Sequence, residues 1–211
     1  MQSDSLDNPF LVSPPTARFG PAGRAPFVLW LTGLSGAGKS TLADIVCRQL
    51  QAMRLPVCHL DGDQIRALTP RLGFTKPERI EHIKNVGTLA SRLEREGACV
   101  VVSLISPYRE ARAHARVLCR NFIEVYVSTP LHECARRDVK GLYKRAIAGE
   151  ISHFTGISSP YEPPLRPSLA IDTLGVSPQS CAAMILNYVR PYLLTAGRLE
   201  GESRTRMDSL Q

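Results

Sequence analysis

The sequence has no long apolar run and no leader-like beginning. No stretch approaches the roughly 18 consecutive apolar residues of a membrane-spanning helix. The N-terminus also lacks a basic segment followed by an apolar one, which a secretory leader requires. These absences argue against insertion of a helix into a membrane and against secretion, so we expect no membrane partner.

Cysteine and histidine are present, but without the spacings that would give them a joint task. The six cysteines include no C-x-x-C pair, and most fall inside apolar segments, where cysteine behaves as a small hydrophobic residue. The five histidines show no metal-ligand spacing. The pattern argues against a disulfide-stapled scaffold and indicates a cytoplasmic location.

Basic charge is in excess but is not concentrated. The 211 residues carry 26 basic and 19 acidic side chains, a net charge of +7, yet no block of lysine and arginine appears. Nucleic-acid-binding chains usually show a basic stripe or a recognition motif. We therefore expect no nucleic-acid partner and an anionic small molecule as substrate.

Five apolar, β-rich runs alternate with helical patterns. The runs are residues 27–32, 57–60, 98–105, 122–127 and 169–171. Such alternation predicts an α/β fold with a five-stranded, mostly parallel sheet and helices on both faces. The clearest helix is 77–96, because Pro77 suits a first turn and Gly97 suits the end. Its polar face carries Arg79, His82 and Asn85.

The two ends of the chain differ in composition from the middle. Residues 1–24 are rich in proline and glycine without any period, which is typical of a flexible arm, and residues 196–211 form a polar tail. Residues 25–195 are then the single expected domain. Within it, 142–167 is rich in Gly, Pro, Ser and basic residues and is predicted to be a lid-type insertion.

A glycine-rich loop follows the first expected strand and opens a helix. It has the G-x-x-x-x-G-K-S pattern of a phosphate-binding loop. Its glycines turn backbone N–H groups toward one point, to which the helix dipole adds positive potential. Lys39 would reach the β- and γ-phosphates of ATP, and Ser40 would offer its hydroxyl to Mg²⁺. The predicted ATP contacts are Gly33, Leu34, Ser35, Gly36, Ala37, Gly38, Lys39, Ser40 and Thr41.

Two carboxylates follow the second expected strand. Asp61 and Asp63 flank a glycine, and ligands of parallel sheets lie beyond the carboxyl ends of the strands. Near a phosphate loop, this pair could hold Mg²⁺ and accept a hydroxyl proton. For Asp61 the alternative is a turn or cap role, which aspartate favours.

Three further sets of candidate residues lie elsewhere in the chain. Ser106, before Pro107, is predicted to cap the following helix. Phe74 and Phe154 lie in loops, where a large aromatic side chain either docks into the core or stacks on a base. A basic group after the fourth strand either clamps a phosphoryl group or forms a solvated face; it consists of Arg136, Arg137, Lys140, Lys144 and Arg145.

Together these segments resemble the adenylylsulfate kinase family over residues 26–192. The phosphate loop alone is generic, whereas the other motifs are highly specific. The motifs are Gly33 to Thr41, Leu60-Asp61-Gly62-Asp63, Leu72-Gly73-Phe74, Ile105-Ser106-Pro107-Tyr108-Arg109, Arg137-Asp138, Lys140-Gly141-Leu142-Tyr143-Lys144, Phe154-Thr155-Gly156 and Ser159-Pro160-Tyr161-Glu162.

The resemblance implies an activity and a set of site residues. The expected reaction is phosphorylation of the 3′-hydroxyl of adenosine 5′-phosphosulfate by Mg-ATP, giving ADP and 3′-phosphoadenylylsulfate, a step of sulfate activation. Asp63 and Lys39 are the expected catalytic residues, with Asp63 accepting the hydroxyl proton. Ser40 and Asp61 are expected at the metal, and Arg137 at ATP. The expected acceptor-site residues are Asp63, Arg66, Phe74, Arg79, His82, Ile105, Ser106, Lys140, Leu142 and Phe154.

Some of these roles come from the family alone. Phe74 and Phe154 would sandwich the adenine of the acceptor, and Arg66 and Arg79 would hold its phosphosulfate. The family's serine at the position of Ser106 has been assigned as a phosphoserine intermediate, although direct in-line transfer needs no covalent stage. The family is commonly dimeric, so the resemblance also implies a homodimer.

The chain departs from the family pattern at the acceptor site. Gln64 stands where the family usually has Asn, and His82 replaces an Asn that touches the substrate. A protonated imidazole at His82 would strengthen acceptor binding as pH falls through about 6.5. This departure leaves two alternatives open: a kinase for another nucleotide or phosphoanhydride, and a nucleotide-binding module without turnover. The intact Lys39, Ser40 and Asp63 argue against the second.

Overall fold

A five-stranded parallel sheet forms the centre of the fold. The computed structural model describes residues 25–68 and 73–193, so the predicted arm 1–24 and tail 196–211 lie outside the described residues. The sheet order is β2-β3-β1-β4-β5, and every pairing is parallel. The mostly parallel sheet predicted from the sequence is therefore parallel throughout. Its strands are β1 (Val28–Thr32), β2 (Val57–Asp61), β3 (Cys99–Ser103), β4 (Phe122–Val127) and β5 (Leu169–Ile171).

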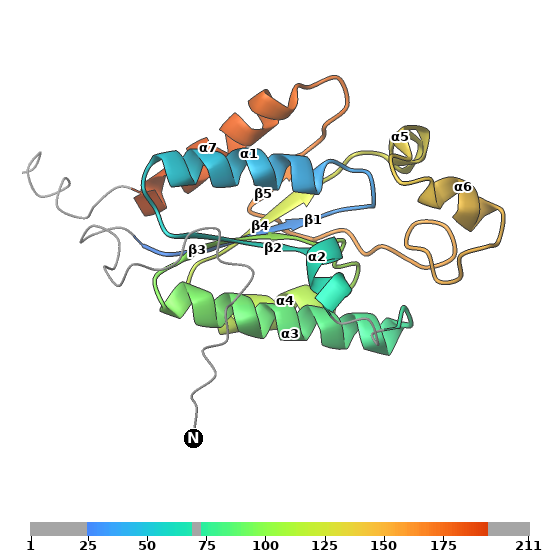
Figure 1. The fold of residues 1–211 in the computed structure, drawn as a ribbon, viewed down its shortest axis with the longest axis horizontal. Coiled ribbons are helices and arrows are strands. Elements are labelled where there is room, and N and C mark those ends of the chain that lie inside the picture. Colours follow the sequence, from blue (N-terminus) through green and yellow to red (C-terminus); the bar gives the residue numbers. More distant parts are fainter. Residues whose placement is uncertain (1–24, 69–72, 194–211) are drawn as a thin grey trace, which may run out of the picture.

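Helices cover both faces of this sheet, as predicted (Figure 1). α1 (Lys39–Ala52) and α7 (Pro178–Leu193) pack together on one face, and α3 (Lys76–Arg95) and α4 (Arg109–Leu118) pack together on the other. None of the helices in the described ranges 25–68 and 73–193 is long and apolar enough to cross a membrane.

The central strand β1 explains why the chain folds into these layers. All five of its residues are fully buried. Side chains alternate along a strand, so Leu29 and Leu31 join the core under α1 and α7, while Val28 and Trp30 join the core over α3 and α4. The apolar side chains of β1 thus contribute to two hydrophobic cores, one on each face of the sheet.

Helix α3 begins and ends one residue before its predicted bounds. At its start, the backbone N–H of Thr75 donates to the Glu78 carboxylate at 3.0 Å, forming half of a capping box. Gly97, just beyond its end, has φ 96°, a left-handed conformation that favours glycine. In the middle, a Cβ at Gly87 would lie 2.7 Å from the Cβ of Ala115, so glycine allows α4 to pack closely.

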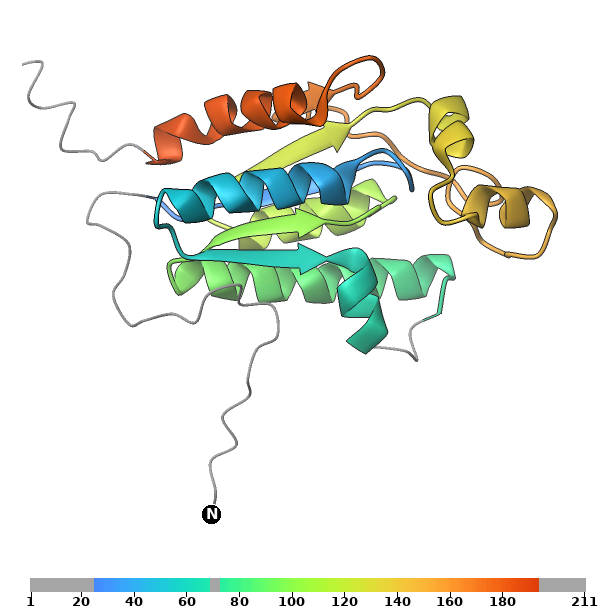
Figure 2. The same ribbon diagram turned by 45° about the horizontal axis from the view of Figure 1, so that its top comes forward.

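Three short helices lie beyond the carboxyl ends of the strands (Figure 2). They are α2 (Gly62–Leu68), α5 (Leu131–Arg137) and α6 (Leu142–Ile147). The third predicted strand, 98–105, ends early at Ser103, because the chain turns there into the loop that leads to α4.

The prediction of one lid-type insertion over 142–167 is wrong for its second half. The Glu162 N–H donates to the Pro107 carbonyl at 2.8 Å, and the Arg112 guanidinium donates to the Glu162 carbonyl at 2.7 Å. Arg109 likewise donates to the Pro163 carbonyl at 2.7 Å. These bonds fix the segment to the α4 side of the sheet.

Candidate active site

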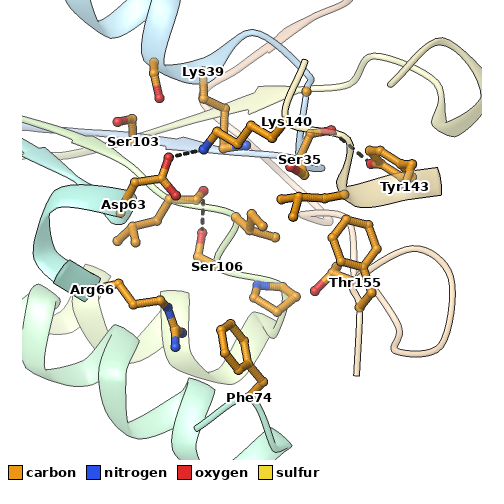
Figure 3. Close-up of a pocket in the computed structure, with 18 of the residues that line it drawn as sticks. Ser35, Lys39, Asp63, Arg66, Phe74, Ser103, Ser106, Lys140, Tyr143 and Thr155 are labelled. Atoms are coloured by element: carbon orange, nitrogen blue, oxygen red, sulfur yellow. Dashed lines mark hydrogen bonds and ion pairs between the residues drawn. The ribbon is translucent and has the colours of Figure 1, made fainter. Parts of the chain in front are cut away.

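A cavity of about 690 Å³ opens at the carboxyl ends of the strands (Figure 3). Every residue predicted from the family pattern to bind the acceptor lines it, as do Lys39, Ser40, Asp61 and Arg137. Of the predicted ATP contacts, Gly33, Leu34 and Ala37 are not among its lining residues. The tertiary structure therefore brings together residues that lie more than 100 positions apart in the sequence.

The phosphate loop connects β1 to α1 in a tight, tethered turn. Gly38 has φ 101°, and a Cβ at Gly33 would lie 2.4 Å from the Val127 carbonyl oxygen, so both positions require glycine. The hydroxyl of Tyr143, from α6, donates to the Ser35 carbonyl at 2.9 Å. This bond ties the phosphate loop to α6 (Leu142–Ile147).

Lys39 is buried at the N-terminus of α1. Its Nζ donates to the Leu34 carbonyl at 2.7 Å within the loop. Burial lowers the pKa of the ammonium group from 10.5 to about 8, against smaller favourable contributions from Cys134, Asp63 and Asp61. A buried cation in a low-dielectric site interacts more strongly with an arriving phosphate than an exposed cation does.

Asp61 ends β2 and uses both of its carboxylate oxygens. Oδ2 accepts from the hydroxyls of Ser40 at 2.8 Å and Ser103 at 2.7 Å. Oδ1 accepts from the N–H groups of Asp63 at 3.0 Å and Gln64 at 3.4 Å. Burial alone would raise the pKa of this carboxyl, but these hydrogen bonds together lower it. Asp61 therefore caps α2 and also contacts Ser40. Both predictions for it, a cap role and a place at the metal, agree with this geometry.

Asp63 lies in the first turn of α2, with its side chain exposed to the cavity. Its carboxylate forms an ion pair with Lys140, which comes from the connection between α5 and α6. Figure 3 shows this pair beside Lys39. The contact spans the cavity, so the basic segment after α5 reaches the expected catalytic carboxylate.

The two phenylalanines have different environments. Phe74 is 51% exposed, and the Arg66 guanidinium lies 4.2 Å from its ring centroid. Phe154 is only 8% exposed, and it packs edge-on against Tyr143 with ring centroids 4.9 Å apart. Phe154 is therefore largely docked into the core and also lines the cavity, whereas Phe74 presents its ring to the cavity (Figure 3); stacking of either ring on a base stays a prediction.

Arg79 connects the two walls that carry these rings. Its Nε donates to the Phe74 carbonyl at 2.7 Å, and its terminal nitrogens donate to the Thr155 hydroxyl at 3.0 Å and to the His153 carbonyl. Because a guanidinium has five N–H donors, two remain available to a ligand. Arg79 therefore helps to fix the shape of the site, and its binding of an anion stays a prediction.

Ser106 is not a helix cap, contrary to the prediction. α4 begins at Arg109 with Tyr108 at the cap position. The Ser106 hydroxyl accepts a hydrogen bond from the Trp30 indole N–H at 3.0 Å, and the residue is 2% exposed with φ 40°. The serine hydroxyl is therefore paired with a residue of the central strand, and the residue also lines the cavity.

His82 lies in the cavity wall, but it does not titrate near pH 6.5 as expected. It is 5% exposed, and its Nε2 has no hydrogen-bond partner. Burial, and then the nearby Arg66 charge, lowers the pKa of this imidazole to about 4. The ring is therefore neutral at physiological pH without a ligand, and a gain in acceptor affinity through protonation would require the bound nucleotide to raise this pKa.

Three polar residues at the site were missed in the sequence. Ser103 pairs in register with Asp61 because β2 and β3 are neighbours, an order that the sequence does not state. The Thr173 hydroxyl lies 2.9 Å from an Arg137 nitrogen and 3.3 Å from the Ala37 carbonyl, linking α5 to the phosphate loop. Tyr143 lies within the family motif Lys140 to Lys144, which was the signal in the sequence that could have identified it.

Comparison with known proteins gives a consistent result. The family model for adenylylsulphate kinase matches residues 25–172. An adenylyl-sulfate kinase of Synechococcus sp. (strain JA-3-3Ab) is 48% identical over 171 residues, which cover 81% of this chain and 97% of that protein. The structure of a Mycobacterium tuberculosis APS kinase in complex with AMPPNP and APS superposes with a TM-score of 0.76 at 40% identity, covering 81% of this chain and 99% of the other. The family model covers most of the chain and the Synechococcus relative is nearly half identical to it, so the chain belongs to the adenylyl-sulfate kinase family.

Proposed function

We propose that this cavity transfers the γ-phosphoryl group of ATP to the 3′-hydroxyl of adenosine 5′-phosphosulfate. The observation that supports the proposal is that one and the same cavity is lined by the phosphate loop, Asp63 and Phe74. ATP would occupy the loop side and the acceptor the α2 and α3 side. Transfer between two bound nucleotides needs positioning and charge stabilisation above all.

The residues at the phosphate loop fit a magnesium ion bound together with ATP. The Ser40 hydroxyl donates a hydrogen bond to Asp61, so the lone pairs of the Ser40 oxygen remain free for a metal. Both oxygens of Asp61 are already engaged, so we assign Asp61 to hold the metal through Ser40. When bound, Mg²⁺ would neutralise charge on the β- and γ-phosphate oxygens.

The chain's own groups would perform the remaining steps. Asp63 accepts the proton of the acceptor hydroxyl, and Lys39 stabilises the negative charge of the transferring group. Lys140, already paired with Asp63 across the cavity, helps to exclude water that would otherwise be phosphorylated. We assign no covalent intermediate to Ser106, because its buried hydroxyl is paired with Trp30.

A coupled ADP-release assay across a panel of acceptors tests the proposal. Adenosine 5′-phosphosulfate should be the preferred acceptor, with ADP formed in equal amount to 3′-phosphoadenylylsulfate. His82 motivates the inclusion of other adenine nucleotides and anhydrides. Folded, ATP-binding protein that turns over none of these acceptors would contradict the proposal, and preference for another acceptor would replace its substrate.

The two phenylalanines should respond differently to truncation. Phe74→Ala should weaken acceptor binding by about 1 to 3 kcal/mol, the usual contribution of a base stacked on an aromatic ring. Its thermal unfolding should remain that of the wild type, since the ring is exposed. Phe154→Ala should instead lower the free energy of unfolding by about 3 kcal/mol. Calorimetric titration with each nucleotide and chemical denaturation separate the two effects; equal destabilisation would show that Phe74 is a core residue.

His82 should contribute a neutral hydrogen bond with no pH dependence of its own. Because its pKa is lowered to about 4, the ring stays uncharged between pH 5.5 and 8. The ratio of the KM for the acceptor in wild type to that in His82→Asn should therefore be constant across this range. A ratio that changes near pH 6.5 would show that the bound nucleotide restores an ordinary histidine pKa.

A further inference from the structure

A polar chain leads from Asp61 away from the cavity to the edge of the sheet. Ser103 Oγ lies 2.7 Å from Asp61 Oδ2, and His59 Nε2 lies 3.0 Å from Ser103 Oγ. His59 stands on β2, the edge strand, and its side chain is 12% exposed. On its other side, Nδ1 lies 3.6 Å from the Asp44 carboxylate of α1, which is beyond hydrogen-bond distance. The proposed reaction steps do not use His59.

Counting protons along this chain fixes the direction of each hydrogen bond. Two backbone N–H groups donate to Asp61 Oδ1 and two hydroxyls donate to Oδ2, so Asp61 is the acceptor in all four contacts. Ser103 has one proton, and its short contact with Asp61 requires that this proton be donated there. The contact between Ser103 and His59 must then use a proton on His59 Nε2. This result is the same for the neutral ring and for the imidazolium.

We propose that His59 is a positioning residue for the metal site. Its Nε2–H holds the Ser103 hydroxyl in the rotamer that donates to Asp61, and Ser103 in turn holds Asp61 Oδ2 toward Ser40. The Ser40 hydroxyl then donates its hydrogen bond to Asp61 and directs its oxygen lone pairs toward the cavity. The inference rests on the proposed function in one respect, that a metal ion binds beside Ser40 together with a nucleotide.

The tautomer of His59 gives a direct test without any ligand. Long-range ¹H–¹⁵N spectra of the full chain should show a protonated Nε2, with the signal assigned by its loss in His59→Gln. A ring with a proton on Nδ1 and a bare Nε2 would overturn the inference, because Ser103 could not then donate its one proton to Asp61 and also bond to Nε2.

Nucleotide binding gives a second test that involves no turnover and no acceptor. We would measure the ADP affinity of each variant in Mg²⁺ and in EDTA. His59→Leu should reduce the Mg²⁺-dependent gain in affinity several-fold, up to about the tenfold lower limit for groups bonded directly to a metal ligand, and leave the affinity in EDTA unchanged. His59→Gln, whose amide N–H can replace Nε2–H, should recover most of the gain.

Matched controls separate this role from a general structural one. Asp44→Asn removes the neighbouring charge but not the Nε2 bond, so it should match the wild type. In a Ser103→Ala background, His59→Leu should cause no further loss, because the effect passes through Ser103. Additive losses, or an unchanged gain in His59→Leu, would overturn the role of His59. A wild type whose ADP affinity ignores Mg²⁺ would overturn the metal site, and this inference with it.

Discussion

Lys39→Ala is expected to remove nearly all phosphoryl transfer while the protein stays folded. Lys39 is the buried cation of the phosphate loop, and its charge would act directly on the transferring group. Loss of one preorganised charge-stabilising donor typically lowers kcat by about 10²- to 10³-fold, which is the minimum expected here. Single-turnover assays at saturating ATP measure the loss. Near-normal turnover would reject the assignment of Lys39.

The lowered pKa of Lys39 predicts how its substitution changes the free energy of unfolding. The folded-state pKa of about 8 is below the ordinary value of 10.5, so the unfolded state binds more protons between these values. The cost of burying the charge is fully present below pH 8 and is relieved as pH rises through this window. Lys39→Met, which keeps most of the volume, should therefore be at least as stable as the wild type at pH 7. Urea denaturation of both proteins tests this, and clear destabilisation would show that the ammonium supports the fold.

Asp63→Asn is expected to lower kcat by at least about a hundredfold, the typical loss when a general base is removed. The change keeps the size of the side chain and one acceptor but removes the negative charge. Since Asp63 is 70% exposed and its ion pair with Lys140 spans open cavity, thermal unfolding should hardly change. Steady-state kinetics with both nucleotides saturating give the relevant kcat.

Asp61→Asn is the matched control for this measurement. Asp61 holds Ser40 and caps α2, so its loss should affect stability and the requirement for Mg²⁺ more than proton transfer. At saturating Mg²⁺ its kcat should exceed that of Asp63→Asn. If Asp61→Asn has the lower kcat, the two carboxylates have been assigned in the wrong order.

Local sequence patterns were sufficient for the elements that carry a complete signal. Strands β4 and β5 match their predicted bounds, and α3 differs from its predicted bounds by only one residue. The helix could be predicted this closely because its capping residues and its apolar period lie within 22 positions of each other. The prediction for 142–167 was wrong where distant bonds decide the structure. Nothing near Glu162 in the sequence shows that Arg112, 50 positions earlier, will hold its carbonyl.

The surroundings of a side chain, which depend on distant residues, explain what the sequence did not show about His82, Phe74 and Phe154. His82 was expected to titrate as an ordinary histidine, but its pKa depends on burial and on Arg66, which belongs to another helix. Phe74 and Phe154 were treated alike, although only Phe154 has a core beside it to enter. Exposure and neighbouring charge are properties of packing, so residue type alone could not give them.

The sequence by itself determined the fold class, the phosphate loop and the family, because each depends on residues close together in the chain or on motifs of fixed spacing. Only the tertiary structure decided which side chains share an oxygen, a charge or a wall of the cavity. Asp61 and Ser103 meet because β2 pairs with β3, and Lys140 reaches Asp63 because two separate segments close over the same edge of the sheet. Such contacts follow from strand order and packing, which the linear spacing of residues does not contain.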